Sequence, residues 1–180
     1  MNTTNETKSK TSYKDPKILA EVAIFIALST VLSIIKIWHM PQGGSITLAS
    51  MAPLLWLALR RGPKIGIFAG VVYGFVQLLI DPSIAHPMQV LLDYPLAFGC
   101  IGLAGFFRNN PLAGATAAVA GRFVMHFISG IIFFAQYAPD GIHPWVYSLV
   151  YNSPYLLIEL GIVSIVLLAL HETRALEMYM

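Results

Sequence analysis

Six long apolar runs separated by short polar joints are the feature that most constrains what this chain can fold into. The runs cover residues 18–35, 46–59, 65–80, 88–107, 112–134 and 145–170. A helix needs about 20 residues to cross the hydrocarbon core of a bilayer. Only 11% of the residues are charged, whereas about a quarter is usual for a soluble domain. The sequence therefore predicts an all-α integral membrane protein with six transmembrane helices.

The second run is the weakest of the six, because it is shorter than a full span and contains Pro53. It is interpreted as a partial or tilted span. The organisation expected is a polar cytoplasmic tail over 1–17, a single six-helix membrane domain over 18–171 and a cytoplasmic tail over 172–180.

Basic residues alternate between the joints in a way that predicts the orientation. The joints 38–45, 81–87 and 136–144 contain no Lys or Arg, and only Lys36 lies near one of their ends. Lys and Arg are enriched on the cytoplasmic side of membrane proteins, so both termini are predicted to be cytoplasmic and these three joints external. The residues assigned to the cytoplasmic side are Lys8, Lys10, Lys14, Lys17, Arg60, Arg61, Lys64, Arg108 and Arg174.

Three ionisable residues, Asp93, Arg122 and His126, lie inside these apolar runs. A charge at the bilayer centre costs about 3 kcal/mol or more, so it is tolerated mainly where it serves a site. Two rows of residues recur at helical spacing and contribute further polar and aromatic groups. The rows are Arg122, His126, Gly130 and Phe134, and then Tyr147, Tyr151, Tyr155 and Glu159 with Asn152 beside them. At about 1.5 Å per residue, most of these groups fall in the outer half of the bundle, which predicts a small-molecule pocket open to the outside.

Structural explanations stay open for the same residues. Asp93 and Arg122 could simply neutralise each other, and His126 could be a hydrogen-bonded core histidine. Glu159 is left without a role. Small residues on the first and third runs, Ala23 with Ala27 and the series Gly66, Gly70 and Gly74, allow close helix packing.

Several chemistries lack their sequence signatures. The chain has no G-x-x-x-x-G-K-[ST] motif for ATP and no H-E-x-x-H or G-x-S-x-G hydrolase motif. Cys100 is the single cysteine, and a net charge of +2 gives no argument for nucleic acid. Uphill transport by this chain would need energy from a partner or an ion gradient.

Several short motifs carry a resemblance to a known family. They are M-P-Q-G-G-S at 40–45, H-P at 86–87, L-L-D-Y at 91–94, H-F-I-S-G at 126–130, Q-Y-A-P at 136–139, and Y-S-L at 147–149 with Asn152. Over residues 18–170 the chain resembles the thiamine-specific S-components, the substrate-binding membrane subunits of energy-coupling factor (ECF) transporters.

The resemblance implies a pocket near the external face that binds thiamine, with the Asp93 carboxylate on the aminopyrimidine. The residues it assigns to substrate binding are Asp93, Tyr94, Arg122, His126, Gly130, Phe134, Tyr147 and Asn152. It also implies a chain that is not an enzyme, carries no catalytic cofactor or metal, and lies in the plasma membrane of a prokaryote.

The resemblance further implies docking through Ala23 and Ala27 on a transmembrane coupling protein, which carries two ATPases. Three alternatives remain. The chain could bind another vitamin or base on the same scaffold, it could be a small intramembrane enzyme that uses Asp93 and His126 as acid and base, or it could be a self-sufficient proton-coupled carrier.

Overall fold

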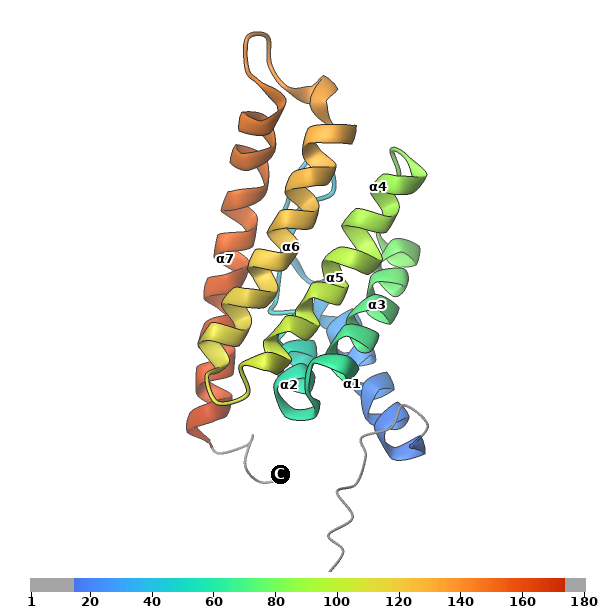
Figure 1. Cartoon of the computed structure of the whole chain (residues 1–180), viewed down its shortest axis with the longest axis vertical. Helices are drawn as coiled ribbons and strands as arrows, with labels where there is room; N and C mark the ends of the chain where they lie inside the picture. Colours follow the sequence, from blue (N-terminus) through green and yellow to red (C-terminus); the bar gives the residue numbers. More distant parts are fainter. Residues whose placement is uncertain (1–14, 174–180) are drawn as a thin grey trace, which may run out of the picture.

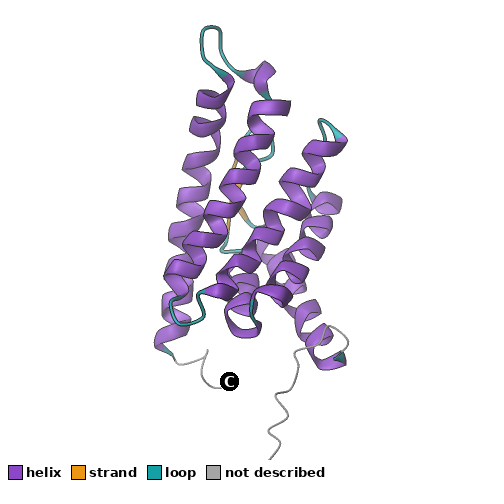
Figure 2. Ribbon diagram, in the orientation of Figure 1, coloured by secondary structure: helices purple, strands orange, loops and turns teal. Residues whose placement is uncertain are grey.

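The structure is a computed structural model that describes residues 15–173, and these form a helical bundle with one small β-hairpin (Figures 1 and 2). Parts of the predicted tails, including Lys8, Lys10, Lys14 and Arg174, lie outside the described residues. The first half of the chain forms α1 (Pro16–Ile34), β1 (Lys36–His39), β2 (Ser45–Thr47), α2 (Ala52–Arg61) and α3 (Pro63–Ile80). A fourth, continuous helical stretch consists of α4 (Pro87–Leu91), the π-helical turn η1 (Leu92–Leu96), α5 (Ala97–Gly99) and the 3₁₀ segment η2 (Cys100–Phe106). The chain then forms α6 (Pro111–Phe133), the short turn η3 (Ala135–Tyr137) and α7 (Pro144–Glu172).

Proline marks the start of the long helical stretches. The residues are Pro16, Pro63, Pro87, Pro111 and Pro144, each in the first turn of its helix. Proline lacks an N–H that the first turn would leave unpaired, and its fixed φ suits a helix start. Asn110 caps α6 by accepting a hydrogen bond from the backbone N–H of Ala113 at 3.1 Å. These signals explain why the apolar runs and the helices begin at nearly the same residues.

In the described part of the chain, five helical stretches are long and apolar enough to cross a membrane, namely 16–34, 63–80, 87–106, 111–133 and 144–172. The second predicted run differs from these five. Its first residues form β2, and α2 has only ten residues, which is about 15 Å of helix. The hairpin and α2 together replace a single regular span.

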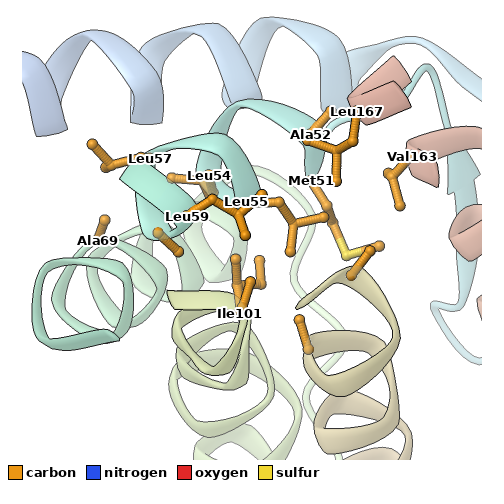
Figure 3. Packing of buried hydrophobic residues seen from close by; sticks show 14 of the residues in the cluster. Met51, Ala52, Leu54, Leu55, Leu57, Leu59, Ala69, Ile101, Val163 and Leu167 are labelled. Carbon is orange, nitrogen blue, oxygen red and sulfur yellow. The ribbon is translucent and has the colours of Figure 1, made fainter. Parts of the chain in front are cut away.

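Helix α2 forms the centre of the apolar core (Figure 3). Leu54, Leu55 and Leu57 have no exposed surface, because α2 packs against α1, α3, η2, α6 and α7. A short helix is stable at this position because protein rather than lipid surrounds it.

Glycines bring α3 into backbone contact with the 87–106 stretch. A Cβ on Gly66 would lie 2.8 Å from the Cα of Gly102, and one on Gly74 would lie 2.6 Å from the carbonyl oxygen of Tyr94. Both distances are too short for a real side chain, so only glycine permits this approach. The close helix packing predicted for the glycine series on the third run is confirmed.

The two ends of the bundle differ in charge. Helix α1 begins and α7 ends at the same end (Figure 1), where Arg60, Arg61, Lys64 and Arg108 also lie. There the Glu21 carboxylate forms ion pairs with Arg60 at 3.0 Å and with Arg61 at 2.6 Å. The hairpin turn, the α3–α4 joint and the α6–α7 joint lie toward the opposite end.

Candidate binding pocket

A pocket opens toward the end of the bundle opposite Arg60, Arg61 and Arg108. It contains about 820 Å³ of space that no atom fills, part of it open to solvent. Its walls come from the hairpin turn, the 87–106 stretch, α6 and α7. All eight substrate-binding residues predicted from the sequence line this one pocket, namely Asp93, Tyr94, Arg122, His126, Gly130, Phe134, Tyr147 and Asn152. Their part in binding stays a prediction.

The carboxylate of Asp93 is held on the pocket wall by three neighbours. Its Oδ2 accepts hydrogen bonds from Nε2 of Gln89 at 2.7 Å and from Oγ of Ser129 at 2.9 Å, and its Oδ1 lies 2.9 Å from Nδ1 of His126. Asp93 belongs to η1, a π-helical turn that contains Pro95. Such turns widen a helix locally and are frequent at functional sites. The result is a carboxylate with a fixed direction and 15% of its side chain exposed.

The ion pair between Asp93 and Arg122 that the sequence left open does not form. No carboxylate oxygen of residues 15–173 lies within 4.0 Å of the Arg122 guanidinium. The group instead lies with Cζ 4.3 Å from the ring centroid of Phe98, a cation–π contact. Its Nη1 lies 2.6 Å from the sulfur of Met51. Arg122 is thus a buried cation beside the pocket that forms no close ion pair within residues 15–173.

His126 presents one unused polar atom. Its Nδ1 contacts Asp93, whereas its Nε2 is buried and makes no hydrogen bond within the described chain. A buried polar group without a partner is unfavourable. Because His126 lines the pocket, a bound molecule could supply the missing partner.

Aromatic rings line the α7 side of the pocket. The ring centroids of Tyr147 and Tyr151 are 5.9 Å apart, and those of Tyr151 and Tyr155 are 6.2 Å apart. Asn152 accepts a hydrogen bond from the Tyr155 hydroxyl at 2.9 Å and donates to the carbonyl of Ser148 at 2.9 Å. This side of the pocket is therefore a connected set of rings and hydrogen bonds.

Tyr94 connects the pocket to the α3–α4 joint. Its hydroxyl donates to the carbonyl of Asp81 at 2.8 Å and accepts from the N–H of Ser83 at 2.6 Å. Asp81 also forms an ion pair with Lys36 of β1 at 2.5 Å. The joint and the hairpin are thereby linked beside the pocket.

Several lining residues were not singled out as site residues from the sequence. Tyr151 is one, and its hydroxyl accepts from the N–H groups of Gln42 at 3.0 Å and Gly44 at 3.4 Å. The four-residue spacing on the last run did include Tyr151 and Tyr155, so a signal for them existed. Gln89 carried a weaker signal, since it lies one helical turn before Asp93.

Two tryptophans, Trp38 and Trp145, do not contribute to the pocket wall. Trp38 is 61% exposed and Trp145 is 48% exposed, and neither lines the pocket.

Within residues 15–173, no three His, Cys, Asp or Glu side chains are grouped so that they could hold a metal ion.

Comparison with known proteins decides the family. Residues 19–178 match the family described as "Thiamine transporter protein (Thia_YuaJ)". The chain belongs to this thiamine transporter family. It is 36% identical to the thiamine transporter ThiT of Bacillus subtilis over 174 residues, which cover 86% of this chain and 90% of that protein.

Further relatives agree with this assignment. The thiamine transporter ThiT of Lacticaseibacillus paracasei is 30% identical over 161 residues, covering 78% of this chain and 79% of that protein. A solved structure of ThiT from Listeria monocytogenes superimposes with a TM-score of 0.79 at 28% identity, covering 87% of this chain and 94% of that one. The thiamine transporter family confirms the predictions of a multi-pass cell-membrane protein, of the S-component resemblance and of a transport role rather than an enzymatic one.

Proposed function

We propose that this chain is the thiamine-binding subunit of an ECF-type transporter, which captures thiamine from outside the cell and delivers it through an ATP-driven coupling module. The observation that carries the proposal is the Asp93 carboxylate, fixed on the wall of a pocket that tyrosine rings also line. Family membership supplies the substrate class.

The carboxylate suits the aminopyrimidine of thiamine. An ionised carboxylate only accepts hydrogen bonds and has about four acceptor positions. Gln89, Ser129 and His126 account for three of these in Asp93. The remaining position is available to the exocyclic amine, which donates. The free Nε2 of His126 offers a second polar contact beside it.

The aromatic side chains suit the thiazolium ring. A cation over an aromatic face gains about 2 kcal/mol when both are desolvated. Tyr147 and Phe134 provide such faces in the pocket. Arg122 carries like charge and offers only donors, so we assign it to the hydroxyl of the hydroxyethyl substituent, which can accept a hydrogen bond. Gly130 and Asn152 shape the pocket wall where α6 meets α7, and Tyr94 orders the α3–α4 joint beside the pocket.

The proposed topology has six helices, counting α2, with both termini in the cytoplasm and the pocket facing outward. The membrane domain covers residues 18–171. The cytoplasmic end of the bundle would then be the one that carries Arg60, Arg61, Lys64 and Arg108, in agreement with the preference of basic residues for that side.

The proposed energy source is a coupling protein with two ATPases, because the sequence contains no phosphate-binding loop of its own. Ala23 and Ala27 on α1 are both exposed in the isolated chain. A surface of small residues allows another helix to approach closely. This face is therefore the proposed docking surface for the coupling protein.

Calorimetry of the purified protein with thiamine and its phosphates tests the proposed function. Saturable binding of thiamine without chemical change supports it. Tight binding of another vitamin or base, with no binding of thiamine, would show that the proposed substrate is wrong. Transport measured in vesicles separates a subunit from a self-sufficient carrier. Uptake by this chain alone would contradict the need for a coupling module.

A further inference from the structure

One buried carboxylate of the bundle, that of Glu159, belongs to no ion pair and does not line the pocket. Glu159 is only 3% exposed, and within residues 15–173 no Lys, Arg or His nitrogen lies within 4.0 Å of its oxygens. A buried charge without compensation is strongly unfavourable, so its contacts indicate what keeps it there. Its Oε1 accepts hydrogen bonds from both the backbone N–H and the hydroxyl of Thr47, each at 2.6 Å.

Thr47 is the last residue of β2, the inner strand of the hairpin. All four residues of β1 are exposed, whereas Ile46 and Thr47 are buried in the bundle. The pairing of the two strands is irregular between Lys36 and Trp38, close to where Thr47 pairs. Non-helical backbone inside a membrane protein needs hydrogen-bond partners from the protein itself. Glu159 provides such a partner for the N–H of Thr47.

The hairpin follows one row of residues along α7. Tyr151 binds the N–H groups of Gln42 and Gly44, and Glu159 binds Thr47. Between them, a Cβ on Gly44 would lie 2.9 Å from Cε1 of Tyr155, so this ring packs directly on the glycine. The eight steps from Tyr151 to Glu159 span about 12 Å of helix, and the three steps from Gly44 to Thr47 span about 10 Å of extended chain. Because these two lengths are similar, residues of α7 can contact both ends of the segment 44–47 at once.

We propose that Glu159 is a positioning residue for the pocket: by holding Thr47 it fixes the segment Gln42–Ser45, which forms one wall of the binding site. The inference rests on the proposed function, since it concerns the affinity for thiamine. Glu159 acts through Thr47 and does not touch the ligand. The property that matters is its acceptor oxygen rather than its charge.

Four purified variants test this role through equilibrium and dissociation kinetics with thiamine. Glu159→Leu removes the acceptor, and Thr47→Val removes the hydroxyl donor. Each should weaken thiamine binding about tenfold or more, because each removes at least one buried hydrogen bond, and the loss should appear mainly as faster dissociation. Glu159→Gln keeps an acceptor oxygen and should restore binding to near the wild-type value. Val163→Ala, a fully buried apolar position one turn further along α7, is the control and should lower the melting temperature without changing the dissociation rate.

Several results would overturn the inference. One is a folded Glu159→Leu protein that binds thiamine as tightly as the wild type, and another is a Gln variant as weak as the Leu variant. If Glu159→Leu does not fold, wild-type dissociation kinetics in Thr47→Val would overturn it, and faster dissociation would support it. A wild-type protein that does not bind thiamine would instead contradict the proposed function.

Discussion

Asp93 and His126 contact each other from neighbouring helical segments, with 2.9 Å between Oδ1 and Nδ1. The contact orients the imidazole so that its other nitrogen is left without a partner in the described chain. Together with Gln89 and Ser129 it also fixes the direction of the carboxylate. A ligand therefore meets a polar wall that is already arranged.

Replacing Asp93 by Asn should weaken thiamine binding more than any change in the external joints. The amide keeps one acceptor oxygen but replaces the other with a donor, which would face either Gln89 and Ser129 or His126. Removing one member of a buried charged network costs about 3–5 kcal/mol. Calorimetry measures the loss. The matched control is Asp140→Asn in the exposed α6–α7 joint, which should bind as the wild type does. Unchanged affinity in a folded Asp93→Asn protein would refute the role of this carboxylate.

Replacing Gly130 by Ala should destabilise the protein and weaken binding. A Cβ at this position would lie 2.9 Å from the Cβ of Ser148, and so would push α6 away from α7 beside the pocket. Overpacking of this kind costs about 1–3 kcal/mol. Thermal unfolding in detergent, with and without thiamine, measures both effects.

Gly161→Ala is the control for Gly130. Gly161 lies on α7, and no described heavy atom would come within 4 Å of a new Cβ there. Since Ala is the better helix former, this variant should be at least as stable as the wild type. Equal behaviour of the two variants would contradict the close contact at Gly130.

Binding and transport should be separable on α1. Ala23→Trp and Ala27→Trp should leave thiamine affinity unchanged in purified protein, because both alanines are exposed and neither lines the pocket. The same changes should abolish uptake and co-purification with the coupling protein. Leu157→Trp, which is 65% exposed on α7 before the change, is the control and should transport normally. Normal uptake by both alanine variants would argue against docking at this face.

The orientation can be tested by cysteine labelling in a Cys100→Ala background. Asp140→Cys should react with a membrane-impermeant maleimide in intact cells, because its joint is predicted to be external. Asn109→Cys, beside Arg108, should react only after permeabilisation. The reverse pattern would invert the topology and place the pocket at the cytoplasmic face.

The sequence predicted the helical spans well because their signals are local. Each long run starts after a proline, and its apolar length is set by the bilayer. The hairpin was predicted only as a loop running into a helix, since its strands have four and three residues and depend on the surrounding bundle. The contact that holds it joins Thr47 to Glu159 across 112 positions. No local pattern indicates such a pairing.

The pocket residues were also predicted together, because helical spacing and charge both marked them. Their pairing was not predicted. Arg122 and His126 lie one helical turn apart on α6, so either could face Asp93 in a sequence-based account. The axial position of α6 against the 87–106 stretch decides between them. Ser129 and His126 contact Asp93, while Arg122 lies against Phe98.

The glycine contacts between α3 and the 87–106 stretch have a consequence for how the pocket can open. Backbone touches backbone there, at Gly66 with Gly102 and at Gly74 with Tyr94. Few side chains are available at these points to change rotamer and absorb a displacement, so the two segments should move as one rigid body. Asp93 belongs to that body. Entry and release of a ligand would then require the hairpin or the α6–α7 pair to move, while the side of the pocket that carries Asp93 stays in place.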